Sequence, residues 1–346
     1  MIITILGAGA MGSALATPLR TAGREVRLWG TWLDDEVLDA CRAGVPHPRT
    51  GVRLADGTAL FSADGLAGAL DGADVVVLAV ASVGFEAVLD RALPLLPPGA
   101  PLAITTKGFV GNEHAPSALL PGALRSMADR VGRKAPTVVA VAGPCKANEV
   151  AAGRPTAAVF ASADQSVGAR LAAVFATSAY RAQVSEDESG VEVCAALKNV
   201  YAIALGIADG LATEGAPWHD LRAAIFTQAV TELLAWTEAV GGRKVTAVGL
   251  AGVGDLEVTG LSGRNKVFGE RMGRGEMPST ALAAMQAAQQ TVEGVPAARL
   301  ANRLGSRADT ARLPLFGVLL DLLDRDLTPA SSETAMAAIL SAVMPQ

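Results

Sequence analysis

The longest helical pattern in the chain covers residues 191–211 and is apolar on nearly every side. Such a helix is typical of a protein interior. Lys198 and Asn199 interrupt it near its middle. An unpaired buried charge is very costly, so Lys198 must reach water, find a partner or lose its proton. It is therefore either a core-helix lysine that reaches the surface or a functional lysine. A membrane span is disfavoured, because a central lysine costs about 2.5–3.5 kcal/mol on insertion scales.

Short apolar runs alternate with helical patterns up to about residue 187, and only helical patterns follow. Unbroken β-branched runs are typical of parallel strands that are buried on both faces. The expected strands lie near residues 2–6, 25–29, 74–82, 101–108, 137–142, 157–162 and 180–187. The later helical patterns cover 189–213, 217–240, 264–273, 279–290, 295–305, 313–324 and 331–343, with a Gly-rich break after the second.

This order predicts an α/β Rossmann-like N-terminal domain, residues 1–187, and an all-α C-terminal domain, residues 188–346. A chain of 346 residues also exceeds the usual size of a single core. A ligand site in the cleft between the two domains is the default expectation.

Composition narrows the class of protein further. The chain is 51% hydrophobic and 18% charged, which is typical of a well-packed globular protein and excludes a disordered one. Its net charge is -5 and no basic stripe appears, which argues against a nucleic-acid partner. The three cysteines lie far apart, so we expect neither a disulfide framework nor a metal site. No basic segment precedes the first strand, so we expect no signal peptide and a cytoplasmic protein.

A glycine motif follows the first expected strand directly. Residues 7–12 have the sequence GAGAMG, and a helical pattern begins after them. In the strand, G-x-G-x-x-G, helix arrangement, Gly7 permits the tight turn, Gly9 allows a pyrophosphate to approach, and Gly12 allows close helix–strand packing. The free amides at the helix N-terminus then bind the pyrophosphate. The alternative is a merely tight turn. We expect the dinucleotide contacts to come from Gly7, Ala8, Gly9, Ala10, Met11 and Gly12.

The residues after the second strand bear on the choice of coenzyme. An acidic residue there binds the ribose 2'-hydroxyl of NAD, whereas an arginine accommodates the 2'-phosphate of NADP. Gly30 and Thr31 follow this strand, with Asp34 and Asp35 a little later. Because no arginine stands at that point, the sequence favours NAD weakly over NADP.

Two further segments carry candidate chemistry. Lys107 follows a predicted strand, at the edge where ligands bind; the alternative is a solvated loop lysine. Gly249, Gly252 and Gly254 predict a flexible loop that delivers Asp255. Ser262 is expected to cap the next helix, where free amides beside Arg264 would form a phosphate-sized anion site. The alternative there is a structural loop with a surface arginine.

Together these segments resemble the NAD(P)-dependent glycerol-3-phosphate dehydrogenases over nearly the whole chain. That family reduces dihydroxyacetone phosphate to sn-glycerol 3-phosphate. The matching blocks are GAGAMGSALA at 7–16, HPRTGVRL at 47–54, TTKG at 105–108, GPCKANEV at 143–150, ALKNVYAIALGIADGL at 196–211, GLAGVGDLEVT at 249–259, GRN at 263–265 and TVEGVPAA at 291–298.

The resemblance implies a role for each matching position. Lys198 becomes the catalytic lysine, with Asp255 and Lys107 as catalytic companions. It implies that substrate contacts come from Lys107, Asn199, Thr259, Gly263, Arg264 and Asn265. It implies that further coenzyme contacts come from Trp29, Lys107, Ala147, Arg264 and Glu293. A homodimer is an open possibility.

A catalytic Lys198 would stabilise the oxyanion that forms on the ketone and then supply a proton. We expect burial to lower the pKa of Lys198 and a nearby Asp255 to oppose that shift.

Departures from the family pattern keep alternatives open. Cys145 and Lys146 replace the usual residues of their loop, Trp218 and His219 stand near a common G-x-N, and Gln228 replaces a frequent arginine. One alternative is therefore a reductase of a different phosphorylated or anionic 2-keto compound on the same architecture. Another is a non-catalytic protein that senses NAD, which the presence of Lys198 and Asp255 argues against.

Overall fold

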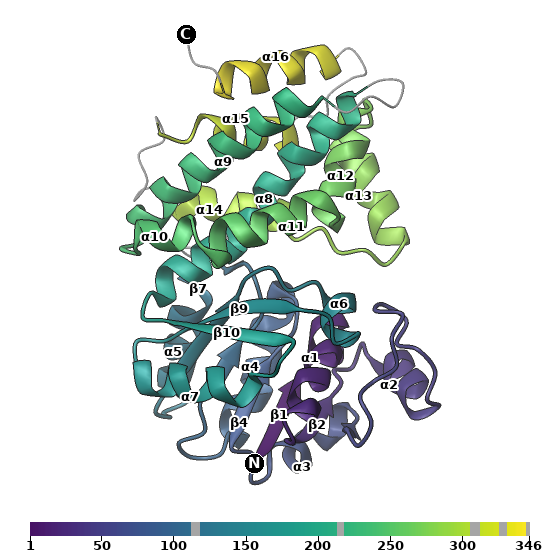
Figure 1. Cartoon of the computed structure of the whole chain (residues 1–346), viewed down its shortest axis with the longest axis vertical. Helices are drawn as coiled ribbons and strands as arrows, with labels where there is room; N and C mark the ends of the chain where they lie inside the picture. The colour runs from purple at the N-terminus through teal and green to yellow at the C-terminus, as the bar shows by residue number, and fades with distance from the viewer. Residues whose placement is uncertain (112–117, 213–217, 305–311, 325–330, 344–346) are drawn as a thin grey trace. The chain divides into compact units, whose positions relative to one another are not determined.

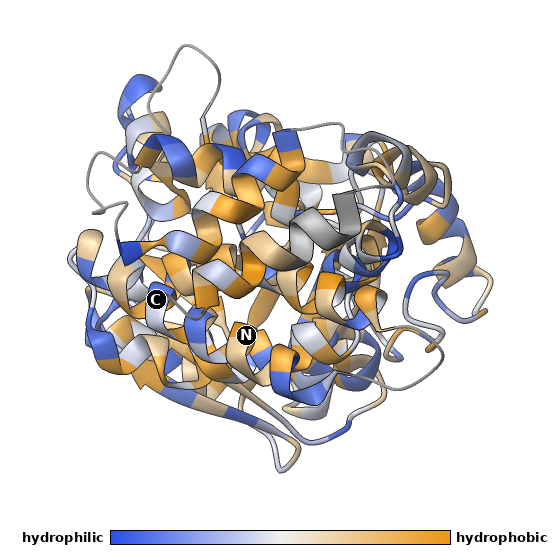
Figure 2. Cartoon of the chain, turned by 90° about the horizontal axis from the view of Figure 1, so that it is seen from above, coloured by the Kyte–Doolittle hydropathy of each residue, from blue (hydrophilic) through white to orange (hydrophobic). Residues whose placement is uncertain are grey.

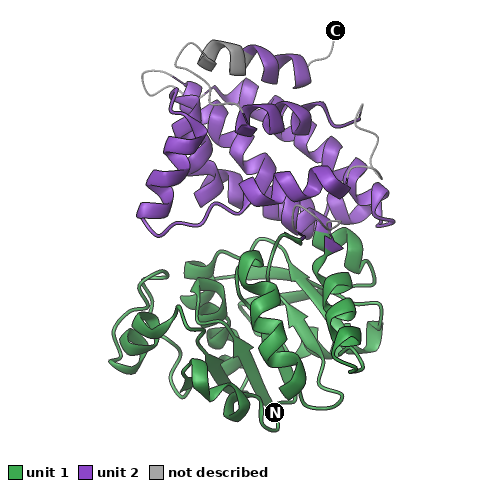
Figure 3. Ribbon diagram, turned by 180° about the vertical axis from the view of Figure 1, so that it is seen from behind, with its two compact units in different colours: residues 1–110, 119–192 green, residues 111–118, 193–346 purple. Residues whose placement is uncertain are grey.

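The chain forms two compact units in a computed structural model, coloured separately in Figure 3. Unit 1 comprises Met1–Val110 and Leu119–Glu192, and unit 2 comprises Gly111–Ala118 and Val193–Gln346. The structure describes residues 1–111, 118–212, 218–304, 312–324 and 331–343. The contact-based division falls at 192/193, whereas the predicted boundary at 187/188 follows the change of sequence pattern and stays a prediction.

Unit 1 is built on an eight-stranded sheet of order β10-β9-β8-β5-β4-β1-β2-β3 (Figure 1). All neighbouring strands are parallel except β8 and β9. The strands are β1 Ile2–Leu6, β2 Glu25–Trp29, β3 Ala59–Phe61, β4 Val75–Leu78, β5 Leu102–Ile104, β8 Val138–Ala142, β9 Thr156–Ala161 and β10 Tyr180–Ser185, with a separate pair β6 Phe109–Val110 and β7 Ala118–Leu119. The helices are α1 Ala10–Thr21, α2 Asp35–Arg42, α3 Leu66–Leu70, α4 Phe85–Ala92, α5 Leu120–Arg130, α6 Ala147–Ala151 and α7 Gln165–Phe175.

This topology confirms the predicted Rossmann-like domain and all seven of its expected strands. The sequence missed β3, a three-residue strand at the edge of the sheet, because so short a run has no clear alternation. Residues 45–57, which include the matching block HPRTGVRL, contain no helix or strand. Strands β1 and β4 lie side by side and the chain leaves them in opposite directions, which makes their carboxyl ends the switch point where ligands bind in such sheets.

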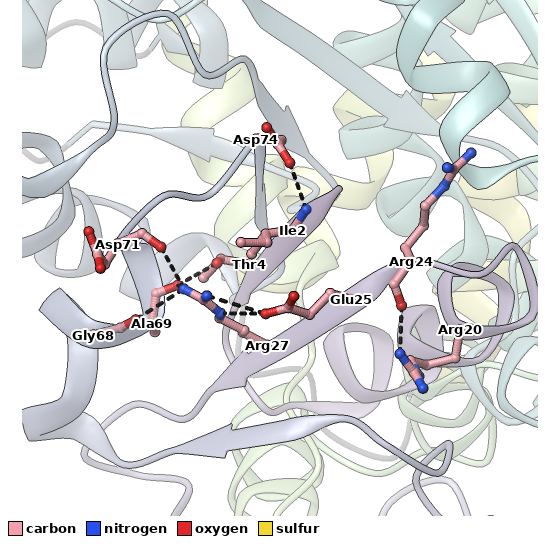
Figure 4. A network of polar contacts seen from close by, with 10 residues as sticks. All are labelled: Ile2, Thr4, Arg20, Arg24, Glu25, Arg27, Gly68, Ala69, Asp71 and Asp74. Carbon is pink, nitrogen blue, oxygen red and sulfur yellow. Dashed lines mark hydrogen bonds and ion pairs between the residues drawn. The ribbon is translucent and has the colours of Figure 1, made fainter.

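Side-chain bonds brace the opposite, amino-terminal end of this sheet (Figure 4). Arg27 on β2 donates to the carbonyl oxygens of Gly68 and Asp71, beside α3. Thr4 on β1 donates to the carbonyl of Ala69 at 2.5 Å, and its side chain is fully buried. These bonds tie β1 and β2 to α3 and the residue that follows it.

Unit 2 is helical and is organised around α8 Glu188–Leu211, which confirms the all-α prediction (Figure 1). Hydrophobic and hydrophilic residues alternate along the helices in Figure 2, as expected for helices that bury one side. Within the described residues α8 alone has the length and hydropathy of a membrane span, and its most apolar 18-residue window is 100% buried inside the protein. The other helices are α9 His219–Ala239, α10 Lys244–Ala247, α11 Asp255–Leu261, α12 Arg264–Gly273, α13 Pro278–Ala287, α14 Gly294–Leu304, α15 Pro314–Asp324 and α16 Ser331–Val343.

The Gly-rich break after α9 was predicted wrongly as a flexible loop. Residues Leu250–Gly254 form a π-helical turn that continues into α11, and neither Gly249 nor Gly254 has a positive φ. Gly252 is required by packing instead, because a Cβ there would lie 1.9 Å from the carbonyl oxygen of Ala247. Asp255 therefore stands at the start of a helix and is rigidly oriented.

Helices α8 and α12 cross with their backbones in direct contact. Gly206 and Gly210 on α8 face Gly269 and Gly273 on α12, and a Cβ at any of the four would lie within 2.3 Å of a backbone oxygen of the other helix. At Gly206 the space beside α8 is filled by the backbone of α12. This crossing sets the N-terminus of α12 beside the middle of α8.

The variant Gly269→Ala is expected to destabilise unit 2, because the added methyl would lie 2.1 Å from the carbonyl oxygen of Ile203. Overpacking of this kind typically costs about 1–3 kcal/mol. Urea unfolding followed by circular dichroism measures the change in the free energy of unfolding. The matched control is Gly317→Ala on α15, where nothing lies within 4 Å, and it should stabilise by about 0.5–1 kcal/mol. Equal effects at the two positions would contradict the packing argument.

Candidate active site

The glycine motif forms a tight turn between β1 and α1, as predicted. Gly7 has a φ of 109°, which favours glycine, and a Cβ there would lie 2.7 Å from Val80. A Cβ on Gly12 would lie 2.0 Å from the carbonyl oxygen of Gly7, so this glycine permits the contact between helix and turn. No side chain caps α1, whose first amides have no acceptor within the helix. The turn therefore fits the pyrophosphate of a dinucleotide.

Not every residue of the turn faces outward. Gly9, Ala10 and Met11 are partly exposed, whereas Ala8 is fully buried and its carbonyl accepts a hydrogen bond from Ser13. Trp29 is fully buried and its indole N–H donates to the carbonyl of Ala63. The side chain of Trp29 is therefore not accessible to a coenzyme, because it is packed inside the core.

Two other expected residues of unit 1 stand at the carboxyl ends of strands. Lys107 follows β5 and is half-buried, and Ala147 is the first residue of α6, after the turn that follows β8. Gly108 has a φ of 138°, and a Cβ on it would lie 2.8 Å from Ser82, in the turn after β4. The turns after β4 and β5 thus meet at the ligand-binding edge of the sheet.

Glu192, a residue that the sequence argument missed, is electrostatically coupled to Lys107. It is buried in the first turns of α8, and its Oε2 has no hydrogen-bond partner. Burial and the neighbouring Glu188 carboxylate raise the pKa of Glu192 well above its ordinary value, while the Lys107 ammonium opposes the shift. The sequence did contain a signal for Glu192, because an acidic residue in an apolar helix must be paired or neutralised, as Lys198 must.

In unit 2, the buried amine of Lys198 is held by two oxygen atoms. Its Nζ donates to Oδ1 of Asp255 at 2.6 Å and to Oγ1 of Thr259 at 2.7 Å. The side chains of Lys198 and Asp255 are 8% and 1% exposed. Asp255 and Thr259 lie one turn apart on α11, so one face of this helix supplies both acceptors. The structure places these three predicted residues in one cluster and excludes a lysine that reaches the surface.

A second chain of polar contacts begins at Asn199, next to Lys198. Its Oδ1 accepts from Nδ2 of Asn265 at 2.9 Å, and its Nδ2 donates to Oε2 of Glu293 at 3.4 Å. Asn265 also accepts from the amide of Gly294 at 2.8 Å. Arg264, half-exposed, lies 3.9 Å from Oε1 of Glu293. Four further residues of the predicted site, Asn199, Asn265, Glu293 and Arg264, thus form a group that begins next to Lys198.

The N-terminus of α12 differs in one detail from the expectation. Gly263 is the N-cap, and no side chain caps the helix, so the predicted cap by Ser262 was wrong. A Cβ on Gly263 would lie 2.9 Å from the carbonyl oxygen of Thr259, which explains why glycine stands there. The uncapped amides beside Arg264 keep the features of an anion site.

The departure at Gln228 has a structural explanation. Gln228 donates to Oε1 of Glu232 at 2.9 Å, and this fully buried carboxylate also accepts from Tyr201 and from the amides of Leu315 and Phe316 at the start of α15. Burial raises the pKa of Glu232, and its four donors oppose that shift. Gln228 therefore helps to tie α8, α9 and α15 together. Trp218 and His219 are exposed at the start of α9, and residues 213–217 lie outside the described part.

Within the described residues, no group of three His, Cys, Asp or Glu side chains is placed to hold a metal ion. Unit 1 has a Rossmann-like sheet with a dinucleotide turn, and unit 2 has a buried lysine beside a helix end with the features of an anion site. These features define the class of two-domain NAD(P)-dependent dehydrogenases.

Comparison of the sequence with models of known protein families identifies the family. The models described as NAD-dependent glycerol-3-phosphate dehydrogenase N-terminus and C-terminus match residues 2–168 and 187–333. The chain belongs to this family.

An NADP(+)-dependent glycerol-3-phosphate dehydrogenase of Archaeoglobus fulgidus is 37% identical over 90% of this chain and 93% of that protein. The crystal structure of glycerol-3-phosphate dehydrogenase from Coxiella burnetii has a TM-score of 0.83 at 30% identity and covers 97% of this chain and 98% of that one. A ketopantoate reductase structure from Ralstonia eutropha has a TM-score of 0.53 at 18% identity, covers 89% of this chain and 99% of that one, and shares the fold alone. These comparisons support glycerol-3-phosphate dehydrogenase over the alternative reductase.

Proposed function

We propose that this protein catalyses the reversible reduction of dihydroxyacetone phosphate to sn-glycerol 3-phosphate with NADH or NADPH. The observation that carries the proposal is the buried Lys198, held by Asp255 and Thr259 within the motifs that the family models match. The names of the relatives, one of them NADP(+)-dependent, support the substrate and the coenzyme class.

The chemistry assigns a task to each group. When bound, the nicotinamide supplies a hydride to the ketone carbon. In the substrate complex Lys198 donates a hydrogen bond to the ketone oxygen, stabilises the negative charge that develops there and gives up a proton to it. Asp255 and Thr259 hold the amine in place, at 2.6 and 2.7 Å. Lys107, with Glu192 near it, supplies a second cation for the anionic substrate from unit 1.

Arg264 and the first amides of α12 bind the phosphate of the substrate in this proposal. Asn265 is buried, and its bonds to Asn199 and Gly294 make it a residue that orients the helix end. Glu293 lies near both Asn199 and Arg264, and the family resemblance implies that it adjoins the nicotinamide side of the coenzyme. Phosphate binding remote from the carbonyl then orients the reacting atoms.

The variant Arg264→Ala is expected to raise KM for dihydroxyacetone phosphate about 10- to 100-fold, because charge-assisted hydrogen bonds contribute about 1.5–3 kcal/mol. Steady-state kinetics at saturating coenzyme measure the effect. Arg274→Ala is the control, because Arg274 lies exposed at the other end of α12. An unchanged KM in Arg264→Ala would remove this residue from the phosphate site.

The test of the function itself is the oxidation of NADH and of NADPH with dihydroxyacetone phosphate, followed by absorbance. Dihydroxyacetone and 2-keto acids serve as comparison substrates. Reduction of the phosphorylated ketone at a far higher kcat/KM supports the proposal. Turnover of a 2-keto acid instead would establish the alternative reductase, and coenzyme binding with no turnover would indicate a sensor.

We also propose a cytoplasmic enzyme, because its substrate and coenzyme are small water-soluble compounds. A homodimer stays a prediction. Sedimentation of the purified protein over a range of concentrations tests the oligomeric state.

A further inference from the structure

The carboxyl group of Glu192 has no assigned step in the reaction proposed above, although it is buried in unit 1. Glu192 is 3% exposed, and its Oε2 accepts no hydrogen bond. A buried carboxylate without a donor is costly, because burial removes the water that would stabilise its charge. This side chain therefore requires either a proton or a nearby cation.

The closest acidic neighbour, Glu188, already has a partner of its own. Glu188 accepts two hydrogen bonds from Nη2 of Arg125 on α5, at 2.7 and 2.9 Å. Residues four apart lie on the same face of a helix, so Glu188 and Glu192 share one face of α8. The Glu188 carboxylate therefore opposes a second negative charge at Glu192.

The cation that acts on Glu192 is Lys107, which follows β5 at the ligand-binding edge of the sheet. Strand β6 begins two residues after Lys107 and packs against α5, the helix that supplies Arg125. Burial and the Glu188 carboxylate raise the pKa of Glu192 well above its ordinary value, and the Lys107 ammonium opposes this shift. Because burial has the largest effect, the neutral acid is favoured.

We propose that Glu192 is a positioning residue that acts through Lys107 and sets the local charge that the anionic substrate meets there. As a neutral acid, Glu192 adds no negative charge beside Lys107. As a carboxylate, it would offset the charge of the ammonium and weaken its attraction for a phosphorylated substrate. The two states differ by one proton on the carboxyl group and no other reactant is involved. The inference rests on the proposed function, because it requires an anionic substrate at Lys107.

The pH dependence of KM for dihydroxyacetone phosphate tests the proposal in wild type and Glu192→Gln, because glutamine has nearly the same shape and cannot ionise. The ratio of wild-type KM to variant KM should rise from about 1 near pH ~6 to about 10 near pH ~9. The ratio of the two kcat values should stay constant, since the charge acts on binding. Titration of the substrate phosphate is common to both proteins and cancels in the ratio.

Three further variants separate the charge of Glu192 from its packing. Glu192→Asp retains an ionisable group, so its KM should still rise with pH. In a Lys107→Ala background the carboxyl loses the cation that favours its ionisation, so the ratio produced by Glu192→Gln should begin to rise at a higher pH. Glu238→Gln removes an exposed carboxylate of unit 2 and is the control, which should leave the pH dependence unchanged.

Infrared difference spectra of wild type and Glu192→Gln at neutral pH report the protonation state of the carboxyl group without turnover. We expect a carboxylic-acid C=O band in wild type that is absent from the variant. The absence of this band, or a KM ratio that does not change with pH, would overturn the proposal and indicate a purely structural role. Failure to reduce dihydroxyacetone phosphate would refute the proposed function, whereas the infrared band does not depend on any substrate, so the two failures are distinguishable.

Discussion

Replacing Lys198 with alanine is expected to abolish turnover and leave coenzyme binding largely intact. Lys198 is proposed as both the stabiliser of the oxyanion and the proton donor. Loss of general acid catalysis typically costs 10²–10⁴-fold in rate, and loss of a preorganised donor to an oxyanion about 10²–10³-fold. We therefore expect kcat to fall by on the order of 10⁴-fold or more. The dinucleotide turn belongs to unit 1 and does not include this side chain.

Stopped-flow or steady-state oxidation of NADPH measures the rate, and nicotinamide fluorescence measures coenzyme affinity in the same variant. Lys244→Ala is a suitable control, because Lys244 is a surface lysine that pairs with Glu238 at 3.0 Å. It should retain wild-type kinetics. Substantial turnover by Lys198→Ala would remove the lysine from the mechanism, and an equal loss of coenzyme affinity would indicate a folding defect.

The order of elements could be predicted from local sequence patterns, whereas the cluster around Lys198 was implied by the resemblance to a known family. Alternating buried runs and helical periods follow directly from hydrophobicity. A lysine inside an apolar helix requires water, a partner or the loss of its proton, and the family resemblance implied Asp255 as its companion. The structure places its carboxylate 2.6 Å from the amine.

The wrong predictions have a common physical cause, since each depends on packing contacts that the local sequence pattern does not reveal. Glycines at 249–254 suggested a flexible loop, but they allow backbone contacts within a helical turn. Trp29 ends a strand at the expected ligand edge, yet its ring is fully buried and bonded to Ala63. Gln228 suggested a changed substrate, but it donates to the buried carboxylate of Glu232, which also accepts from the amide of Leu315 on α15.

The coenzyme rule shows the same limit. It assigns the ribose to an acidic residue after β2. Asp34, the first acidic residue there, is buried and instead accepts hydrogen bonds from the amides of Thr31 and Ala8.

The second large effect concerns stability. Removing the carboxylate of Asp255 with Asp255→Ala leaves the ammonium of Lys198 buried without its charge partner, since both side chains are nearly inaccessible to solvent. Breaking a buried ion pair from one side typically costs about 3–5 kcal/mol. We therefore expect Asp255→Ala to lower the free energy of unfolding by about that amount and to lose activity. Chemical denaturation measures the first effect and the standard assay the second.

The double variant Lys198→Met/Asp255→Leu separates stability from catalysis. Replacing both partners with apolar side chains of similar volume removes the desolvation cost together with the attraction, and such replacements are often neutral or stabilising by about 1–4 kcal/mol. We expect the double variant to be at least as stable as wild type and inactive. That result would mean that the pair is retained for its chemistry. If the double variant were as unstable as Asp255→Ala, the pair would be a structural requirement of unit 2, and loss of activity in Lys198→Ala would no longer be evidence for a catalytic amine.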